Sequence, residues 1–284
     1  MILTQSNHTK ATDGGHMDLL IGFLTQITMT VGIIFLFGWI ISLLRRGFCS
    51  VAGKHGPRLL LVTGIIGTPI HELSHALMCL LFGHKITEIK LYQPKSKDGS
   101  LGHVSHTYNR KNIYHQIGNF FIGTAPVLLG CAFVLLFMII LIPGTFGSVT
   151  SEMNTLHFGG SLLSTIESIF TFVWGMVKAL FSPQDFTSWR WWIFIVLAVM
   201  ISTHMEMSAS DIKSSLRGLL FISIILLLVD GIIYLISRDA FSSFVGAAVS
   251  FGSLLSAFLS LSILFLFLLL LLSLLIKGIG VIFK

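Results

Sequence analysis

Apolar residues in this sequence gather into long runs, and short polar segments separate the runs. A helix needs about 20 largely apolar residues to cross the hydrocarbon core of a bilayer. Six segments meet this requirement: Leu19 to Leu44, Leu59 to Phe82, Ile117 to Ile142, Trp191 to Met207, Leu219 to Ile236 and Val245 to Ile276. The pattern predicts an all-α polytopic membrane protein with about six transmembrane helices.

The polar segment after the second run has a different character. Lys85 to Tyr92 and Leu101 to Tyr108 are rich in β-branched and aromatic residues, and they flank a turn-forming stretch from Gln93 to Ser100. This pattern predicts a small β-hairpin inserted after the second span. The exposed edge of such a hairpin can receive an extended peptide by strand addition, and a plain connecting hairpin has the same sequence pattern.

Composition agrees with a bilayer as the solvent. The chain is 54% hydrophobic and 11% charged, whereas ordinary soluble domains are about one-quarter charged. The net charge of +6 comes from Lys and Arg between the apolar runs, where membrane proteins carry them for orientation, so we expect no nucleic-acid partner. Cys49, Cys79 and Cys131 are scattered without a CxxC pair, which predicts neither a disulfide framework nor a cysteine zinc site.

The distribution of Lys and Arg also bears on orientation. With six spans, eleven of these residues fall on the side of the predicted hairpin and seven on the opposite side, which favours a cytoplasmic hairpin. A basic cluster between residues 45 and 58 favours the reverse orientation. We expect a multi-pass integral protein of a prokaryotic cell membrane, embedded in the lipid bilayer, with its hairpin side in the cytoplasm.

The second apolar run contains an HExxH motif, His71-Glu72-Leu73-Ser74-His75. Residues four apart lie on one helical face about 6 Å apart, so both histidines can bind one zinc ion while Glu72 lies beside the water to be activated. Zinc lowers the pKa of such a water towards ~7, and a glutamate can pass its proton to a leaving amine. Ionisable residues within a span are costly unless they serve a purpose. The motif therefore indicates a hydrolase with Glu72 as the catalytic residue.

Gly64, Gly67 and Pro69 precede the motif. Proline removes a backbone donor, which predicts a kink or a restart of the helix near Thr68 and a route for water to the zinc. Glycines that simply allow close helix packing are the alternative interpretation.

A zinc hydrolase needs a third protein ligand, and spacing alone fixes none. His204 and Asp211 are seven residues apart and would share one helical face. Asp230 lies in mid-span, where a carboxylate hydrogen-bonded to a neighbouring helix is the alternative interpretation. The candidates are His204, Glu206, Asp211 and Asp230. Histidines near the hairpin are interpreted as ordinary surface residues, namely His84, His103, His106 and His115.

The segment Gly67-Thr68-Pro69-Ile70-His71-Glu72-Leu73-Ser74-His75-Ala76, followed by Gly83 and a hairpin, resembles the site-2 protease family of intramembrane zinc metalloproteases. The resemblance covers residues 60 to 215. A second element, Gly123-Thr124-Ala125-Pro126-Val127-Leu128-Leu129-Gly130, is similar to the glycine-proline element that the family has in the span after its hairpin.

This resemblance implies an aspartate as the third zinc ligand, either Asp211 or Asp230. Asp230 is followed by glycine, as is usual in the family, but we favour Asp211 because a serine-rich turn precedes it and it follows the fourth span. The implied site then has one Zn2+ per chain on His71, His75 and Asp211. The implied substrate is a membrane protein or a membrane-associated peptide.

The chain also departs from the family pattern. Neither aspartate is preceded by Asn-Pro, no PDZ-like module is evident, and two further spans follow the core. Substrate and regulation are therefore not transferred from the resemblance. We expect a single membrane-embedded domain over residues 1–284, with a catalytic core at 59–215 and additional spans at 219–284.

Two other classes of function predict different sequence features. A metal-dependent membrane binding or scaffold protein would have no need of Glu72. A transporter would carry polar residues in several spans, whereas the first, third and sixth runs have no charged residue in their central portions. An intramembrane zinc metalloprotease is the function that the sequence favours.

Overall fold

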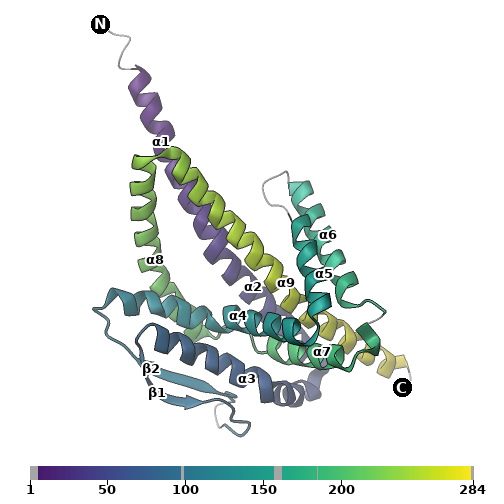
Figure 1. Cartoon of the computed structure of the whole chain (residues 1–284). Helices are drawn as coiled ribbons and strands as arrows, with labels where there is room; N and C mark the ends of the chain where they lie inside the picture. The colour runs from purple at the N-terminus through teal and green to yellow at the C-terminus, as the bar shows by residue number, and fades with distance from the viewer. Residues whose placement is uncertain (1–5, 97–98, 157–161, 184, 283–284) are drawn as a thin grey trace.

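The structure is a computed structural model that describes residues 6–96, 99–156, 162–183 and 185–282 (Figure 1). Helices dominate it, and a single hairpin of strands β1 (Lys85–Lys90) and β2 (His103–Thr107) follows the helix with the HExxH motif. The prediction of a helical chain with a β-hairpin at this point is confirmed. The α-helices are α1 (Ser6–Ile27), α2 (Ile33–Ala52), α3 (Gly56–Leu81), α4 (Ile113–Leu141), α5 (Pro143–Glu152), α6 (Leu162–Leu180), α7 (Trp189–Ser202), α8 (Ala209–Ile236) and α9 (Arg238–Ile282).

Four helical stretches of the described residues are long and apolar enough to cross a membrane: His16–Leu81, Ile113–Leu141, Ala209–Ile236 and Arg238–Ile279. The first stretch contains α1, α2 and α3, which are separated only by a π-helical turn and a 3-10 turn. Helix α7 has 14 residues, fewer than a bilayer requires. These stretches are consistent with an integral membrane protein, and the count of six spans stays a prediction.

The predicted fourth span, Trp191 to Met207, was too long. Helix α7 ends at Ser202, and a short non-helical segment, residues 203–208, leads from it to α8. This segment contains His204 and Glu206. Because its backbone is not consumed by helical hydrogen bonds, it has carbonyl oxygens available for other partners.

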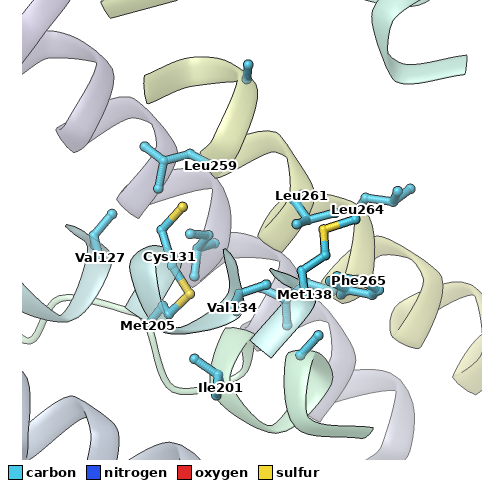
Figure 2. Close-up of a cluster of buried hydrophobic side chains, with 14 of the residues drawn as sticks. Val127, Cys131, Val134, Met138, Ile201, Met205, Leu259, Leu261, Leu264 and Phe265 are labelled. Carbon is cyan, nitrogen blue, oxygen red and sulfur yellow. The ribbon is translucent and has the colours of Figure 1, made fainter. Parts of the chain in front are cut away.

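A tightly packed apolar core lies between α4, α7 and α9 (Figure 2). Its α4 residues pack against Ile201 and Met205 on one side and against residues of α9 on the other (Figure 2). Helix α9 also runs beside α2 (Figure 1). The labelled core residues of α4 are Val127, Cys131, Val134 and Met138, and those of α9 are Leu259, Leu261, Leu264 and Phe265.

Helix α3 packs against α4 and α7, while α4 packs against α8. Glycine permits the closest of these approaches: a Cβ atom at Gly67 would overlap the ring of His204 and the backbone of α7. Helix α3 continues through Pro69 without interruption, so the predicted restart near Thr68 does not occur. The interpretation of Gly67 as a helix-packing residue is the one that the structure supports.

The hairpin lies against α3 (Figure 1). Its strands pair antiparallel with Glu88 opposite Ser105, and a bulge interrupts the register between Ile86 and Glu88. Gly102, just before β2, allows close contact with the helix, because a Cβ atom there would lie 2.8 Å from Cγ of Glu72. Strand β2 is thereby placed beside the motif.

Candidate metal centre

His71 and His75 project from one face of α3 and bring two ring nitrogens together. Their Nε2 atoms lie 3.2 Å apart, and the ring centroids are 4.9 Å apart in an edge-on arrangement. Two nitrogens at about 2.0–2.1 Å from one zinc ion, at a tetrahedral angle, would lie about 3.3–3.4 Å from each other. The helix therefore sets the spacing that a shared metal ion requires.

Backbone carbonyls determine which nitrogen of each imidazole carries the proton. Nδ1 of His71 lies 2.6 Å from the carbonyl oxygen of His204, and Nδ1 of His75 lies 2.8 Å from that of Ile122. A carbonyl oxygen can only accept, so each Nδ1 donates and a neutral ring has its lone pair on Nε2. Metal-ligating histidines usually have this kind of outer partner.

Asp211 brings a carboxylate to the same point from the first turn of α8. Its Oδ1 lies 3.5 Å from Nε2 of His75, and the three groups offer ligand atoms within 4.8 Å of one another. The second carboxylate oxygen, Oδ2, accepts hydrogen bonds from the backbone N–H and the hydroxyl of Ser208, at 2.8 and 2.6 Å. Asp211 thus completes a helix-capping box and directs its free oxygen towards the histidines.

A close approach of α4 and α8 makes this meeting possible. A Cβ atom at Gly123 would overlap the hydroxyl of Ser215 and the backbone carbonyl of Asp211. A glycine of α8 makes the same kind of contact with α4, because a Cβ atom at Gly218 would overlap the backbone of Phe120. Gly123 begins the glycine-proline element singled out in the sequence, and here it sets how near α8 can lie to His75.

A metal ion between these three groups explains their positions better than direct hydrogen bonds among them. Two lone pairs on nitrogen and a carboxylate oxygen converge within a few ångströms, and in the neutral tautomers no hydrogen lies between them. Facing acceptors repel unless a proton or a cation lies between them. Two imidazoles and one carboxylate form a three-ligand set typical of catalytic zinc.

Glu72 is buried next to this cluster and lines the same cavity. Among the described residues its carboxylate has no hydrogen-bond partner, so its oxygens are available to a molecule in the cavity. The cavity has a volume of about 760 Å³, within the range of pockets that bind small molecules or peptide segments. Strand β2 and the residues just before it form one wall, and residues of α3, α4, α8 and the 203–208 segment, together with Arg45 of α2, form the others.

The other candidates for the third ligand have different roles. The side chain of His204 lies by Thr63 and Thr68, with Nε2 and Nδ1 at 3.0 and 3.3 Å from their hydroxyls. Glu206 forms an ion pair with Arg45 of α2 at the edge of the cavity. Asp230 accepts a hydrogen bond of 2.8 Å from Gln26 of α1.

Asp230, the alternative candidate for the third ligand, does not reach the cluster of His71, His75 and Asp211. It lies on the same helix as Asp211, five turns further on, and each turn advances about 5.4 Å along the axis. Its carboxylate joins α8 to α1, as the helix-packing interpretation expected.

The histidines near the hairpin divide into two groups. His103 lies near Glu88, with Nε2 and Oε2 3.4 Å apart, and His115 accepts a hydrogen bond from the backbone of Asn109. His84 and His106, in contrast, lie beside Cys79 with ligand atoms within 4.8 Å of one another. Sequence reasoning missed this second group, because it treated the histidines as surface residues and the cysteine as isolated.

Two groups of side chains that could hold a metal ion are thus present in the described part of the chain. The first group consists of His71, His75 and Asp211, with Glu72 beside it. Comparison with models of known families, with curated proteins and with solved structures finds no match for this chain.

Proposed function

We propose that this protein is an intramembrane zinc metalloprotease that resembles the site-2 protease family. The observation that carries the proposal is the convergence of His71 Nε2, His75 Nε2 and Asp211 Oδ1 beside the buried carboxylate of Glu72. Three ligands together with an adjacent free glutamate are what zinc-dependent hydrolysis of a peptide bond requires.

The residues present suit zinc as the metal. Imidazole nitrogens and a carboxylate are borderline donors that favour zinc over calcium and magnesium, which prefer sets made of oxygen alone. When bound, zinc supplies Lewis-acid activation of water and of a substrate carbonyl. His71 and His75 keep their Nε2 atoms available because backbone carbonyls hold the Nδ1 protons.

Glu72 acts as the proton carrier in this proposal. It takes a proton from the attacking water and passes it to the nitrogen of the amide bond being broken, so that the amine can leave. Its surroundings support this role, because Gly102 lets β2 pass close to Cγ of Glu72. A substrate chain lying along β2 would bring its backbone into the cavity that Glu72 and the metal ligands line.

Strand β2 is suited to receive an extended peptide. In the described sheet it pairs only with β1, and residues on both sides of Ser105 line the cavity. Adding a strand to a free sheet edge is a common way to bind unfolded peptide, with backbone hydrogen bonds providing affinity. We propose that a membrane-associated substrate unwinds and binds here.

The test compares wild-type protein with Glu72→Gln, which keeps the size of the side chain but cannot accept the proton. Both proteins are produced in cells that lack the endogenous gene, and new N-termini of membrane proteins are identified by mass spectrometry. We expect termini that appear with the wild type, disappear with Glu72→Gln and disappear with a zinc chelator. Loss of general acid-base catalysis lowers the rate about 10²- to 10⁴-fold.

Zinc content of the two purified proteins separates the alternatives. Equal zinc content with cleavage in the wild type alone supports the protease. Equal zinc content with identical sets of termini would favour the metal-dependent scaffold instead. If neither protein binds zinc when the metal is supplied, the metal centre itself is wrong.

A further inference from the structure

A second cluster of metal-binding side chains lies where α3 meets the hairpin. It consists of Cys79 near the end of α3, His84 in the connection that follows, and His106 in β2. Cys79 is fully buried and His84 is 3% exposed. The Nδ1 atoms of the two histidines lie 3.0 Å apart, and all three ligand atoms lie within 4.8 Å of one another.

The surroundings hold the His84 ring in place and determine its tautomer. Nε2 of His84 donates to the carbonyl oxygen of His115 at 2.9 Å, so the lone pair of the neutral ring is on Nδ1. Tyr108 stacks on this ring, with centroids 4.7 Å apart and planes inclined by 12°. An outer hydrogen bond of this kind orients a histidine for a metal.

His106 is also suited to a metal. Its Nδ1 lies 3.0 Å from Nδ1 of His84, and the centroids of the two rings are 4.9 Å apart. A hydrogen bond from His106 to His84 would explain why the two imidazoles lie so close together. It would give no role to the buried thiol of Cys79, which lies beside both.

We propose that Cys79, His84 and His106 form a second metal site, separate from the first and suited to zinc. One thiolate and two imidazoles are a soft and borderline set that selects zinc over calcium and magnesium. His106 lines the large cavity, which gives the metal a route to the site. This proposal does not depend on proteolytic activity.

The two groups have no ligand in common: the first consists of His71, His75 and Asp211, and the second of Cys79, His84 and His106. A second metal connects the end of α3 to β2 and thereby fixes the strand that forms a wall of the cavity.

Cobalt provides a test that distinguishes the sites, since only the second contains sulfur. Metal-free wild-type protein in detergent is titrated with Co2+, and the thiolate-to-cobalt charge-transfer band in the near ultraviolet is recorded. We expect the band in the wild type, its loss in Cys79→Ser and its retention in Asp211→Asn. Cys131→Ser is the matched control, because Cys131 is also buried but lies in α4 away from the cluster.

His106→Gln gives a second variant that does not alter the fully buried cysteine. It should weaken Co2+ binding at the second site at least about 10-fold, with the charge-transfer band appearing only at higher metal concentration. Absence of the band in saturated wild-type protein would overturn the proposal, whatever the variants do. So would a band that survives in Cys79→Ser and vanishes in Cys131→Ser. Loss of the band in Asp211→Asn would by itself show that the two groups of ligands do not form separate sites.

Discussion

Nε2 of His75 and Oδ1 of Asp211 lie 3.5 Å apart and connect the C-terminal half of α3 to the first turn of α8. The two residues are distant in the sequence, and their approach depends on α4, which packs against both helices. Helix packing therefore controls the geometry of the proposed zinc site as directly as the ligands do.

If Asp211 is the third ligand, substitutions of the two aspartates of α8 should affect zinc affinity differently. Asp211→Asn keeps an oxygen for the helix cap but removes the charge, so we expect zinc affinity to fall by more than the 10- to 100-fold typical of losing an outer-sphere partner. Asp230→Asn should leave zinc affinity unchanged, because Asp230 contacts Gln26 on α1. Competition titration against a chromogenic chelator measures both. The reverse order of affinities would make Asp230 the ligand.

The cap of α8 is expected to tune the same site. Ser208→Ala removes the hydroxyl that donates to Oδ2 of Asp211, which costs about 1 kcal/mol of stability and leaves the carboxylate held by the backbone N–H alone. We expect a 10- to 100-fold loss of zinc affinity. Ser210→Ala is the control, since the Ser210 hydroxyl contacts only that of Ser208 among the described residues. Equal effects of the two variants would contradict a specific role for the cap.

Gly123 should be intolerant of even one methyl group. In Gly123→Ala the new Cβ would overlap the backbone of Asp211, so α8 must move away and carry its carboxylate from the histidines. We expect reduced zinc content and a lower melting temperature. Gly231→Ala on α8 meets nothing within 4 Å and should bind zinc normally. Zinc analysis and thermal unfolding in detergent give both readouts, and normal zinc binding by Gly123→Ala would exclude this packing argument.

The ion pair between Arg45 and Glu206 predicts coupling between α2 and the 203–208 segment. Both side chains are about three-quarters buried, so removing one partner leaves a poorly solvated charge and should cost about 1–3 kcal/mol, between the surface and buried limits. Arg45→Gln with Glu206→Gln should cost less than the sum of the single changes. A double-mutant cycle by denaturant unfolding in detergent measures this coupling. Simple additivity would show that the pair contributes nothing.

Local patterns predicted the elements of the fold well. The spacing of His71 and His75 placed both rings on one face, and the turn residues between Gln93 and Ser100 predicted the hairpin. Contacts between distant segments were the part that sequence reasoning could not determine. Asp211 follows an apolar run and Asp230 lies within one, and only the packing of α8 on α4 shows which of them reaches His75.

The second cluster was missed for a related reason. Side chains alternate between the two faces of β2, but the face on which His106 lies follows only from the register with β1. The bulge between Ile86 and Glu88 alters that register. His84 is buried because the chain turns sharply at Gly83, which has a φ of +70°. The four-residue spacing from His75 to Cys79 was the available signal, since it continues the row begun by His71 and His75.

The outer partners of His71 and His75 are main-chain oxygens, those of His204 and Ile122. Every residue type has a carbonyl, so these two positions can change identity during evolution without altering the support given to the metal ligands. Related proteins with the same chemistry therefore need share very little sequence outside the HExxH helix and the aspartate turn. A search for relatives by the geometry of these two peptide groups would be more sensitive than one by side-chain similarity.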